Sequence, residues 1–546
     1  MSEIETKARK QEHTSNANID EFGLERNEEA TEQETHENNI ISSKWKLITI
    51  CFGLMLSIFI AAIDENIVAT ALGGIVKDFK ASGDLTWIAA SYLLTMTAFQ
   101  PLYGKFSDIF GRKQAMLFAL FIFLIGSIGC GAAPNIIALV VFRAIAGVGA
   151  GGLIALPFII MSDVVPLQQR SAYMGLIQAT FAISSVIGPI IGGLFVDYVT
   201  WRWVFYINVP ISVIAMVVVL FLIPVSKAVS NATLKQKMKR VDTWGTLTLV
   251  TGSICIILAT NWGGKEYSWG SGAVIGSFVA GIVVMAIFIF IELKVAQEPV
   301  IPSHIFTRNV IAGSITTIAF GFTMFTALNY IPLYHQTIHG RSATEAGVQT
   351  IPFMFGLSFF AGTSGLITNK TGTYRPIMWL GMTMIVLGNS LYGGLIRSGI
   401  TLAEEIIYAL LLGSGIGLNI QLALVASQAS VPDKDAAVTT AFIRYALSIG
   451  GVLGLAVHGA VFNNVLAQQL DEILPGIDSK KIMESLESLY QLPSDQLSLA
   501  LKAYEYSYKM LFVSMIPISV IGLISCLCIQ HIPLDRNGSD QKAAAH

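Results

Sequence analysis

The chain has 546 residues, of which 53% are hydrophobic and only 13% are charged, and its mean hydropathy is +0.64. Soluble domains carry roughly 25% charged residues, so this composition excludes a water-soluble enzyme of two or three domains. The formal net charge of −2 leaves no basic surface to neutralise phosphates, which excludes a nucleic-acid-binding protein. The composition therefore predicts an all-α polytopic membrane protein.

The first segment, residues 1–44, is expected to be a disordered cytoplasmic tail. Residues 1–43 contain eleven acidic and four basic residues, which gives this stretch a net charge of −7. A polar, acidic stretch of this kind buries too little apolar surface to fold. It also lacks the basic start and the apolar core of a cleavable signal peptide, so we expect the first membrane helix to direct the chain to the membrane.

Fourteen apolar stretches follow, each close to the roughly 20 residues that a membrane-spanning helix needs. They lie at 47–73, 86–106, 114–132, 135–161, 171–195, 203–223, 244–260, 270–292, 309–332, 346–367, 374–396, 405–427, 435–462 and 509–530. If the N-terminus is cytoplasmic, the six cytoplasmic loops hold fourteen Lys and Arg residues, whereas the six short outer loops hold six. Because Lys and Arg are enriched in cytoplasmic loops, this asymmetry predicts that both termini lie in the cytoplasm.

The longest outer loop, about 464–508, is predicted to contain an amphipathic helix that lies on the outer mouth of the protein or on the membrane surface. Ser494 is expected to cap this helix. Its apolar positions recur at helical spacing, at Leu497, Leu501, Tyr504 and Tyr508. His458, near the outer end of the preceding span, is expected to be interfacial.

A short pattern of Gly, Asp or Asn, and Gly occurs twice, at offsets of 0, +4 and +7. The loop after the second span contains Gly104, Asp108 and Gly111, and the loop after the tenth contains Gly365, Asn369 and Gly372. The repeat indicates two related six-helix bundles, spans one to six and nine to fourteen, with two inserted helices between them. The predicted organisation is a tail (1–44), an N-terminal bundle (45–224), a linker with the inserted helices (225–308), a C-terminal bundle (309–534) and a short cytoplasmic tail (535–546).

Several motifs resemble those of the major facilitator superfamily. The segment GKFSDIFGRK from Gly104 to Lys113 resembles its loop signature, and Arg143 with Gly147 and Gly149 resembles its fourth-helix motif. Gly188, Pro189, Gly192 and Gly193 resemble its fifth-helix antiporter motif. The segment DENIVATAL from Asp64 resembles the first-helix motif of its fourteen-helix drug:proton antiporters, the fungal or bacterial multidrug efflux type. WRWVFYINVP, from Trp201, resembles a segment common in fungal and bacterial members. The resemblance covers about residues 47–534 and implies the major facilitator fold, with 14 transmembrane helices.

Asp64, Glu65 and Arg143 are the candidate proton-coupling residues. Ionisable groups at membrane depth are costly, so they usually line a pathway or form pairs. At about 1.5 Å per residue, Asp64 and Arg143 lie roughly 13 and 12 Å below the outer ends of their helices, which permits contact. Glu65 projects about 100° away from Asp64. The resemblance assigns coupling to Asp64, and the alternative is a structural ion pair.

The loop residues Gly104, Asp108, Gly111, Arg112 and Lys113 are a candidate conformational switch. Gly104 allows close approach of a helix from the other bundle. Asp108 can pair with Arg112 and lie near the positive N-terminus of that helix. The alternative is a charged loop that only fixes the topology.

The remaining candidates lie inside apolar spans. Gly188 and Pro189 predict a kink in their helix, and Gly192 and Gly193 predict close packing against a neighbour. The motif has two possible roles, a purely structural one and one in antiport. In the C-terminal bundle, five polar residues are candidates for the substrate cavity, although helix–helix hydrogen bonds explain the amides equally well. These residues are Asn329, Tyr330, Asn419, Gln421 and Arg444.

The sequence shows no nucleophile arrangement, nucleotide-binding signature or metal-ligand spacing, so we expect a transporter with no metal or cofactor, driven by an ion gradient. The resemblance implies a proton-coupled antiporter that exports amphipathic, cationic or neutral organic compounds by alternating access. Its expected partners are small molecules, protons and the lipid bilayer, and it is expected to be a monomer in the plasma membrane. One alternative is a vacuolar transporter of basic amino acids, because TAFQPLYGKFSDIFGRK resembles fungal vacuolar transporters. The other is a transport-inactive sensor with the same fold.

Overall fold

The computed structural model describes residues 44–79, 85–223, 233–263, 267–395, 400–475, 479–484 and 486–534. The predicted tails therefore lie outside the described residues, except for Lys44. The helices are α2 (Lys44–Phe79), α3 (Leu85–Phe99), α4 (Leu102–Phe110), α5 (Arg112–Gly131), α6 (Ile136–Val164), α7 (Leu167–Tyr198), α8 (Trp203–Tyr206), α9 (Asn208–Leu222), α11 (Leu234–Lys239), α12 (Thr243–Trp262), α13 (Gly272–Lys294), η1 (Ser303–Ile305), α14 (Arg308–His339), α15 (Ala343–Gln349), α16 (Ile351–Thr371), α17 (Arg375–Leu395), α18 (Leu402–Ile420), α19 (Leu422–Gln428), η2 (Asp433–Asp435), α20 (Ala436–Ile473), α21 (Ser479–Glu484), α22 (Leu486–Tyr490) and α23 (Ser494–Leu527).

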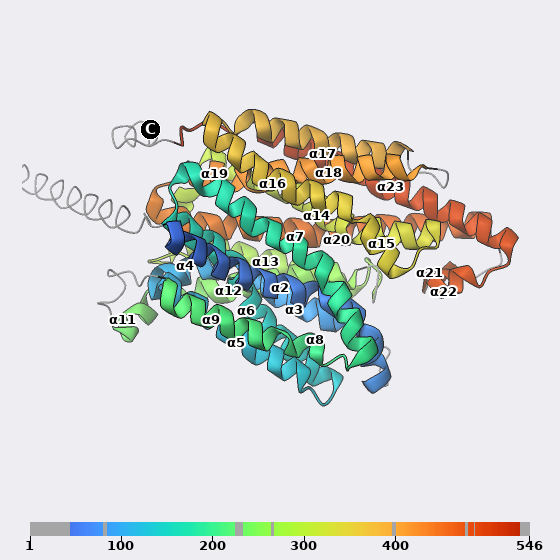
Figure 1. Ribbon diagram of the computed structural model, residues 1–546, viewed down its shortest axis with the longest axis horizontal. Helices are drawn as coiled ribbons and strands as arrows, with labels where there is room; N and C mark the ends of the chain where they lie inside the picture. Colours follow the sequence, from blue (N-terminus) through green and yellow to red (C-terminus); the bar gives the residue numbers. More distant parts are fainter. Residues whose placement is uncertain are drawn as a thin grey trace, which may run out of the picture.

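The long helices run along the longest axis of the molecule (Figure 1). The helices of the first half, α2 to α9, pack against one another, chiefly α2 on α7, α5 on α6 and α3 on α6. Those of the second half do the same, chiefly α16 on α18, α14 on α20 and α17 on α23. The described chain begins and ends at the same end of the molecule, at the left of Figure 1. We call this the terminal end, and the other the distal end.

Twelve helices among the described residues are long and apolar enough to cross a membrane. The other two predicted spans fall short for different reasons. The stretch 86–106 is divided into α3 and α4 at Gln100 and Pro101, where proline lacks the N–H that would continue the helix. Helix α17, at 374–396, is long enough at 21 residues, but no 18-residue stretch of it is hydrophobic enough for it to count among the twelve. The count of fourteen spans stays a prediction.

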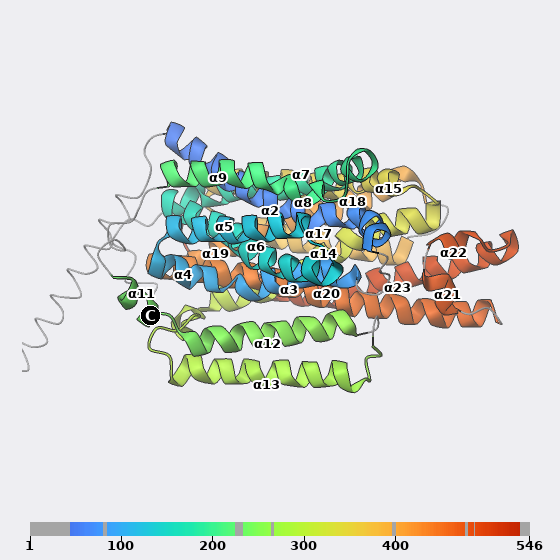
Figure 2. The same cartoon turned by 90° about the horizontal axis from the view of Figure 1, so that it is seen from below.

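Helices α12 and α13 lie as an outlying pair beside the two bundles (Figure 2). Helix α12 packs against α3 of the first half and α20 of the second, and Ser253 Oγ lies 2.6 Å from Tyr445 Oη. Helix α13 packs mainly on α12, and only 17% of its most apolar stretch is buried. Because its exposed side chains are large and apolar, such as Ile282 and Phe290, this helix presents a lipid-facing surface.

Two predictions about the distal end are wrong. Helix α23 begins at Ser494 and continues through the last span, so residues 494–508 do not form a separate surface helix, and Ser494 makes no cap. The apolar face packs instead against α20, where the rings of Tyr508 and Phe462 lie 4.7 Å apart. His458 is fully buried, not interfacial, because its Nδ1 lies 3.0 Å from Thr326 Oγ1 and its ring packs edge-on against Phe322.

Candidate functional site

Asp64 and Arg143 form an ion pair inside the N-terminal bundle. Asp64 lies on α2 and Arg143 on α6, and Arg143 Nη1 is 2.5 Å from Asp64 Oδ2. Each side chain is only 1% exposed, so either charge alone would be strongly destabilising. The structure thus brings together two residues that the sequence places at the same depth. Their role in proton coupling stays a prediction.

The pair has further polar and aromatic neighbours. Asn208 of α9 donates a hydrogen bond from Nδ2 to the second carboxylate oxygen of Asp64, at 2.7 Å. Arg143 Nε donates to the carbonyl oxygen of Ile88 at 3.0 Å, and the guanidinium carbon lies 4.0 Å from the centre of the Tyr92 ring. Both carboxylate oxygens of Asp64 therefore accept a hydrogen bond. Asn208 lies in the segment WRWVFYINVP, but its contact with Asp64 was not predicted.

Glu65 lies on a different face of α2. Its side chain is partly exposed, and within the described residues it makes no hydrogen bond or ion pair. The two neighbouring acids are therefore in different environments, one fully paired and buried and the other open on one side. This arrangement agrees with the turn of about 100° per helical residue.

The candidate switch residues lie where α4 meets α5 and the first turns of α20. A Cβ added at Gly104 would lie 2.8 Å from Ala441 Cβ, so glycine permits the close approach of α20. Gly111 ends α4 with a φ of +100°, a backbone conformation that favours glycine. Lys113 donates to the carbonyl oxygen of Leu220 near the end of α9.

Arg112 connects the switch loop to the end of α6. It pairs with Asp108 one turn earlier, and its Nε lies 2.6 Å from Asp163 Oδ2. Asp163 was missed by the sequence analysis, because its distance of 51 residues from Arg112 provides no local signal. Gly104 makes the contact with α20. That Asp108 lies beside the N-terminus of this helix therefore stays a prediction.

The repeated pattern in the second half has the same geometry. Gly365 of α16 packs against α7, where an added Cβ would lie 2.5 Å from the backbone nitrogen of Ala172. Gly372 ends α16 with a φ of +69°. In both copies the first glycine thus contacts the opposite bundle and the second ends its helix.

The antiporter-like motif packs α7 against α2. A Cβ at Gly192 would collide with Thr70 Oγ1, whereas one at Gly188 would be in ordinary contact with Asn66. Gly193 has open space around it. The side chain of Pro189 lies outside the described residues, and α7 stays helical through this motif.

Arg444 of α20 is buried between the bundles. It donates to Gln421 at 3.0 Å and to Gln178 of α7 at 3.3 Å, and its guanidinium carbon lies 3.4 Å from the centre of the Phe158 ring on α6. No carboxylate pairs with it among the described residues. Two partners, Gln178 and Phe158, were not predicted, because they come from the other half of the chain.

Of the other three cavity candidates, the two asparagines make local hydrogen bonds, whereas Tyr330 contacts another helix. Asn329 is exposed and donates to the carbonyl oxygen of Phe325 on its own helix. Asn419 is buried and donates to Gly415, one turn before it. Tyr330 packs against Phe462 of α20. Of the five predicted residues, Gln421 and Arg444 are joined by a side-chain hydrogen bond.

The hydrogen bonds between the bundles gather near the terminal end. The side-chain hydrogen bonds of this kind include four that each join the halves of the helices nearer that end. They join Arg170 with Gln428, Ser171 with Gly365, Gln178 with Arg444, and Gln100 with Ser448. Toward the distal end, the helices of the two halves slope apart in Figure 1. The structure therefore represents a state in which the bundles are joined at one end.

The comparison with known families agrees with this arrangement, since residues 54–455 match the Major Facilitator Superfamily. The chain belongs to this superfamily. The rubrofusarin-specific efflux pump aurT of Gibberella zeae is 36% identical over 473 residues, which are 86% of each chain. The thioclapurine efflux transporter tcpA of Claviceps purpurea is 36% identical over 90% of this chain and 91% of its own. The protein is therefore an integral, multi-pass membrane transporter of the efflux-pump family, not an enzyme.

Solved structures support the fold of this superfamily member. The human organic anion transporter MFSD10 superposes with a TM-score of 0.57 at 12% identity, covering 88% of this chain and 99% of its own. The proton:xylose symporter XylE superposes with a TM-score of 0.58 at 13% identity, covering 88% and 94%.

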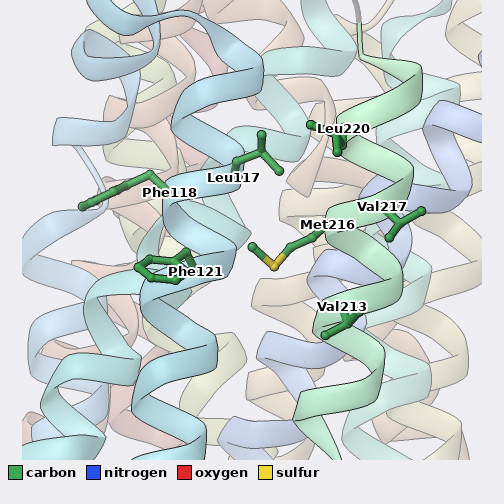
Figure 3. A pocket seen from close by; sticks show the side chains of 7 residues that line it. All are labelled: Leu117, Phe118, Phe121, Val213, Met216, Val217 and Leu220. Carbon is green, nitrogen blue, oxygen red and sulfur yellow. The ribbon is translucent and has the colours of Figure 1, made fainter.

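A surface groove of this transporter, between α5 and α9, is a poor substrate site. All seven side chains that line it are apolar (Figure 3). Phe118 and Phe121 on one side and Val217 and Leu220 on the other are about half exposed. A substrate site needs a few polar groups for orientation, so this groove belongs to the lipid-facing surface.

Proposed function

We propose that the protein is a proton-coupled antiporter that exports amphipathic organic compounds by alternating access. The proposal rests on the buried Asp64–Arg143 pair. This pair lies in the N-terminal bundle, which contacts the C-terminal bundle at the terminal end. The efflux-pump names of relatives at about one-third identity support the direction of transport and the class of substrate. The proposed topology has fourteen spans, comprising two six-helix bundles and the α12–α13 pair, with the terminal end in the cytoplasm of a plasma-membrane protein.

In this proposal Asp64 exchanges a proton during the transport cycle. When its carboxylate is ionised, Arg143 and Asn208 hold it in place. Protonation removes the attraction between Asp64 and Arg143 and releases the guanidinium to other partners. Because α6 also carries Phe158, which packs on Arg444 of the opposite bundle, a movement of α6 can change the contact between bundles. Substrate binding and protonation would thus shift one conformational equilibrium in opposite directions.

The test is transport into reconstituted vesicles after a pH jump, with rhodamine 6G, rubrofusarin and lysine as probes. Wild-type protein should concentrate an amphipathic probe against its gradient, and Asp64→Asn should abolish this uptake while retaining probe binding. Glu65→Gln should have a milder effect. Asp78→Asn is the matched control, because Asp78 is an exposed acid of the same helix, paired with Arg202.

Three outcomes would contradict parts of the proposal. Concentration of probe by Asp64→Asn, together with failure of Glu65→Gln, would show that Glu65 is the coupling acid. Uptake of lysine alone would identify the protein as a basic amino acid transporter. Binding without transport of any probe would favour a sensor.

A further inference from the structure

A group of three potential metal ligands lies at the distal end of the C-terminal bundle. His335 and His339 are one turn apart on α14, with their rings stacked at 5.8 Å. Glu405 enters from the first turn of α18. Its Oε1 lies 2.8 Å from His339 Nε2 and its Oε2 lies 3.8 Å from His335 Nδ1. The three ligand atoms all lie within 4.8 Å of one another.

A structural hydrogen bond explains only part of this group. The contact between His339 and Glu405 has normal hydrogen-bond length, but 3.8 Å is too long for a second bond to His335. Among the described residues His335 Nδ1 has no hydrogen-bond partner, and the whole side chain is only 4% exposed. A buried polar atom without a partner is costly, and an ion bound at this nitrogen would remove that cost.

We propose that His335, His339 and Glu405 bind a divalent transition-metal ion, for which Zn²⁺ is the best fit. Zinc binds imidazole nitrogen and carboxylate oxygen at about 2.0–2.2 Å, so tetrahedral ligand atoms are about 3.3–3.5 Å apart. The 2.8 Å contact joins Glu405 Oε1 to His339 Nε2, and the 3.8 Å contact joins Oε2 to His335 Nδ1. One ligand atom from each residue lies within 4.8 Å of the others, so rotation of the side chains has to draw these atoms together around the ion. A set of two nitrogens and one oxygen favours Zn²⁺ over Ca²⁺ or Mg²⁺, which prefer oxygen ligands.

The surroundings suit a bound ion with one open coordination position. The side chain of His339 is 19% exposed, whereas that of Glu405 is 5% exposed, so an ion would reach the site from the side of His339. The Tyr334 ring lies 5.4 Å from each imidazole ring, and its buried hydroxyl has no hydrogen-bond partner in the part of the chain that the structure describes. A water on the metal can accept or donate a hydrogen bond there. All three ligands belong to one bundle, so the ion would join α14 to α18 without blocking movement between the bundles.

Little in the sequence pattern points to this group. Two histidines four residues apart on a helix share one face, but the third ligand lies 66 residues beyond His339. The packing of α14 against α18 brings it close. The proposed site does not depend on the proposed antiport, because metal binding can be measured without transport.

The experiment is a metal titration of the purified full-length protein carrying no polyhistidine tag. Co²⁺ should bind at one ion per chain and produce the visible absorption of a tetrahedral N/O site, and Zn²⁺ should remove this absorption by displacement. His335→Ala, His339→Gln and Glu405→Gln should each weaken Co²⁺ binding at least tenfold. His458→Gln is the control, because His458 is a buried histidine of the same bundle that pairs with Thr326, and it should bind as the wild type does.

Melting temperatures of the metal-free variants separate loss of folding from loss of binding. Zn²⁺ should raise the melting temperature of the wild type and of His458→Gln, but not of Glu405→Gln. Absence of a stoichiometric Co²⁺ signal in the wild type would overturn the proposal. The same signal in folded His335→Ala and Glu405→Gln would also overturn it.

Discussion

At the scale of single residues, the buried Asp64–Arg143 pair is the feature most sensitive to substitution. Both charges are removed from water, and each is compensated mainly by the other. Replacing one partner leaves a buried charge, which in soluble proteins costs about 3–5 kcal/mol, whereas replacing both with apolar groups is often nearly neutral. The energetic role of the pair can therefore be separated from its role in transport.

We expect Asp64→Leu and Arg143→Met each to lower the free energy of unfolding by about 3–5 kcal/mol. The double variant should be more stable than either single variant, because no charge stays unpaired. Denaturant unfolding of the purified protein in detergent measures all three. Additive losses in the double variant would show that the two residues do not act as a pair.

The sequence pointed to particular residues where a charged side chain, which is costly to bury, stood in an apolar span. Asp64, Arg143 and Arg444 were found in this way, and the first two are in contact. The contacts of Asn208 and Asp163 were not predicted, since they depend on which face of the helix meets a partner from a distant segment. Helices that are apolar on every side carry no periodic signal to fix that face. His458 was misplaced for the same reason.

At the scale of helices, the two glycine patterns make equivalent contacts in the two halves of the chain. Gly104 contacts α20 and Gly365 contacts α7, so each half supplies one close approach to the other. The repeat and the contact at Gly104 were predicted from the sequence, because small residues in membrane helices typically mark the close approach of a second helix. The extension of α23 beyond the membrane was not predicted, since amphipathic spacing is the same against water, lipid or protein.

A pair of substitutions on α16 tests this contact. A Cβ at Gly365 would lie 2.5 Å from backbone atoms of Ser171 and Ala172, which cannot move aside as a side chain can. Gly365→Ala should therefore weaken the joined state and slow transport several-fold. Gly362→Ala, on the same helix with open space around it, should transport normally or gain slightly in stability. Equal transport by both variants would show that the close approach is not needed.

At the scale of the whole molecule, the two bundles are joined at the terminal end through a small number of polar contacts. The inserted pair lies at the interface between the bundles, since α12 contacts both halves of the chain. In the segment after α13, Glu298 forms ion pairs with Lys105 of α4 and with Arg240. Burial alone would raise the pKa of Glu298, but these two ion pairs lower it below its ordinary value. The inserted pair was predicted from the sequence, but its position was not. The interface between the bundles, on which it packs, exists only after both bundles have folded.

Alternating access requires the contacts at the terminal end to break in each transport cycle. Ser448 Oγ of α20 donates to Gln100 Oε1 at the end of α3, at 2.8 Å, so these two side chains report directly on that end. In a background without the five native cysteines, Gln100→Cys with Ser448→Cys should be cross-linked by a short, reducible bis-methanethiosulfonate reagent. Transport should then fall at least tenfold and return on reduction, because the linked bundles cannot separate. Asn389→Cys with Ser519→Cys is the control, since Asn389 Nδ2 and Ser519 Oγ lie 2.8 Å apart within one bundle. Linking this pair should not stop transport. Normal transport by fully cross-linked Gln100→Cys/Ser448→Cys protein would show that the terminal end stays closed throughout the cycle, and the protein would then need another route for its substrate.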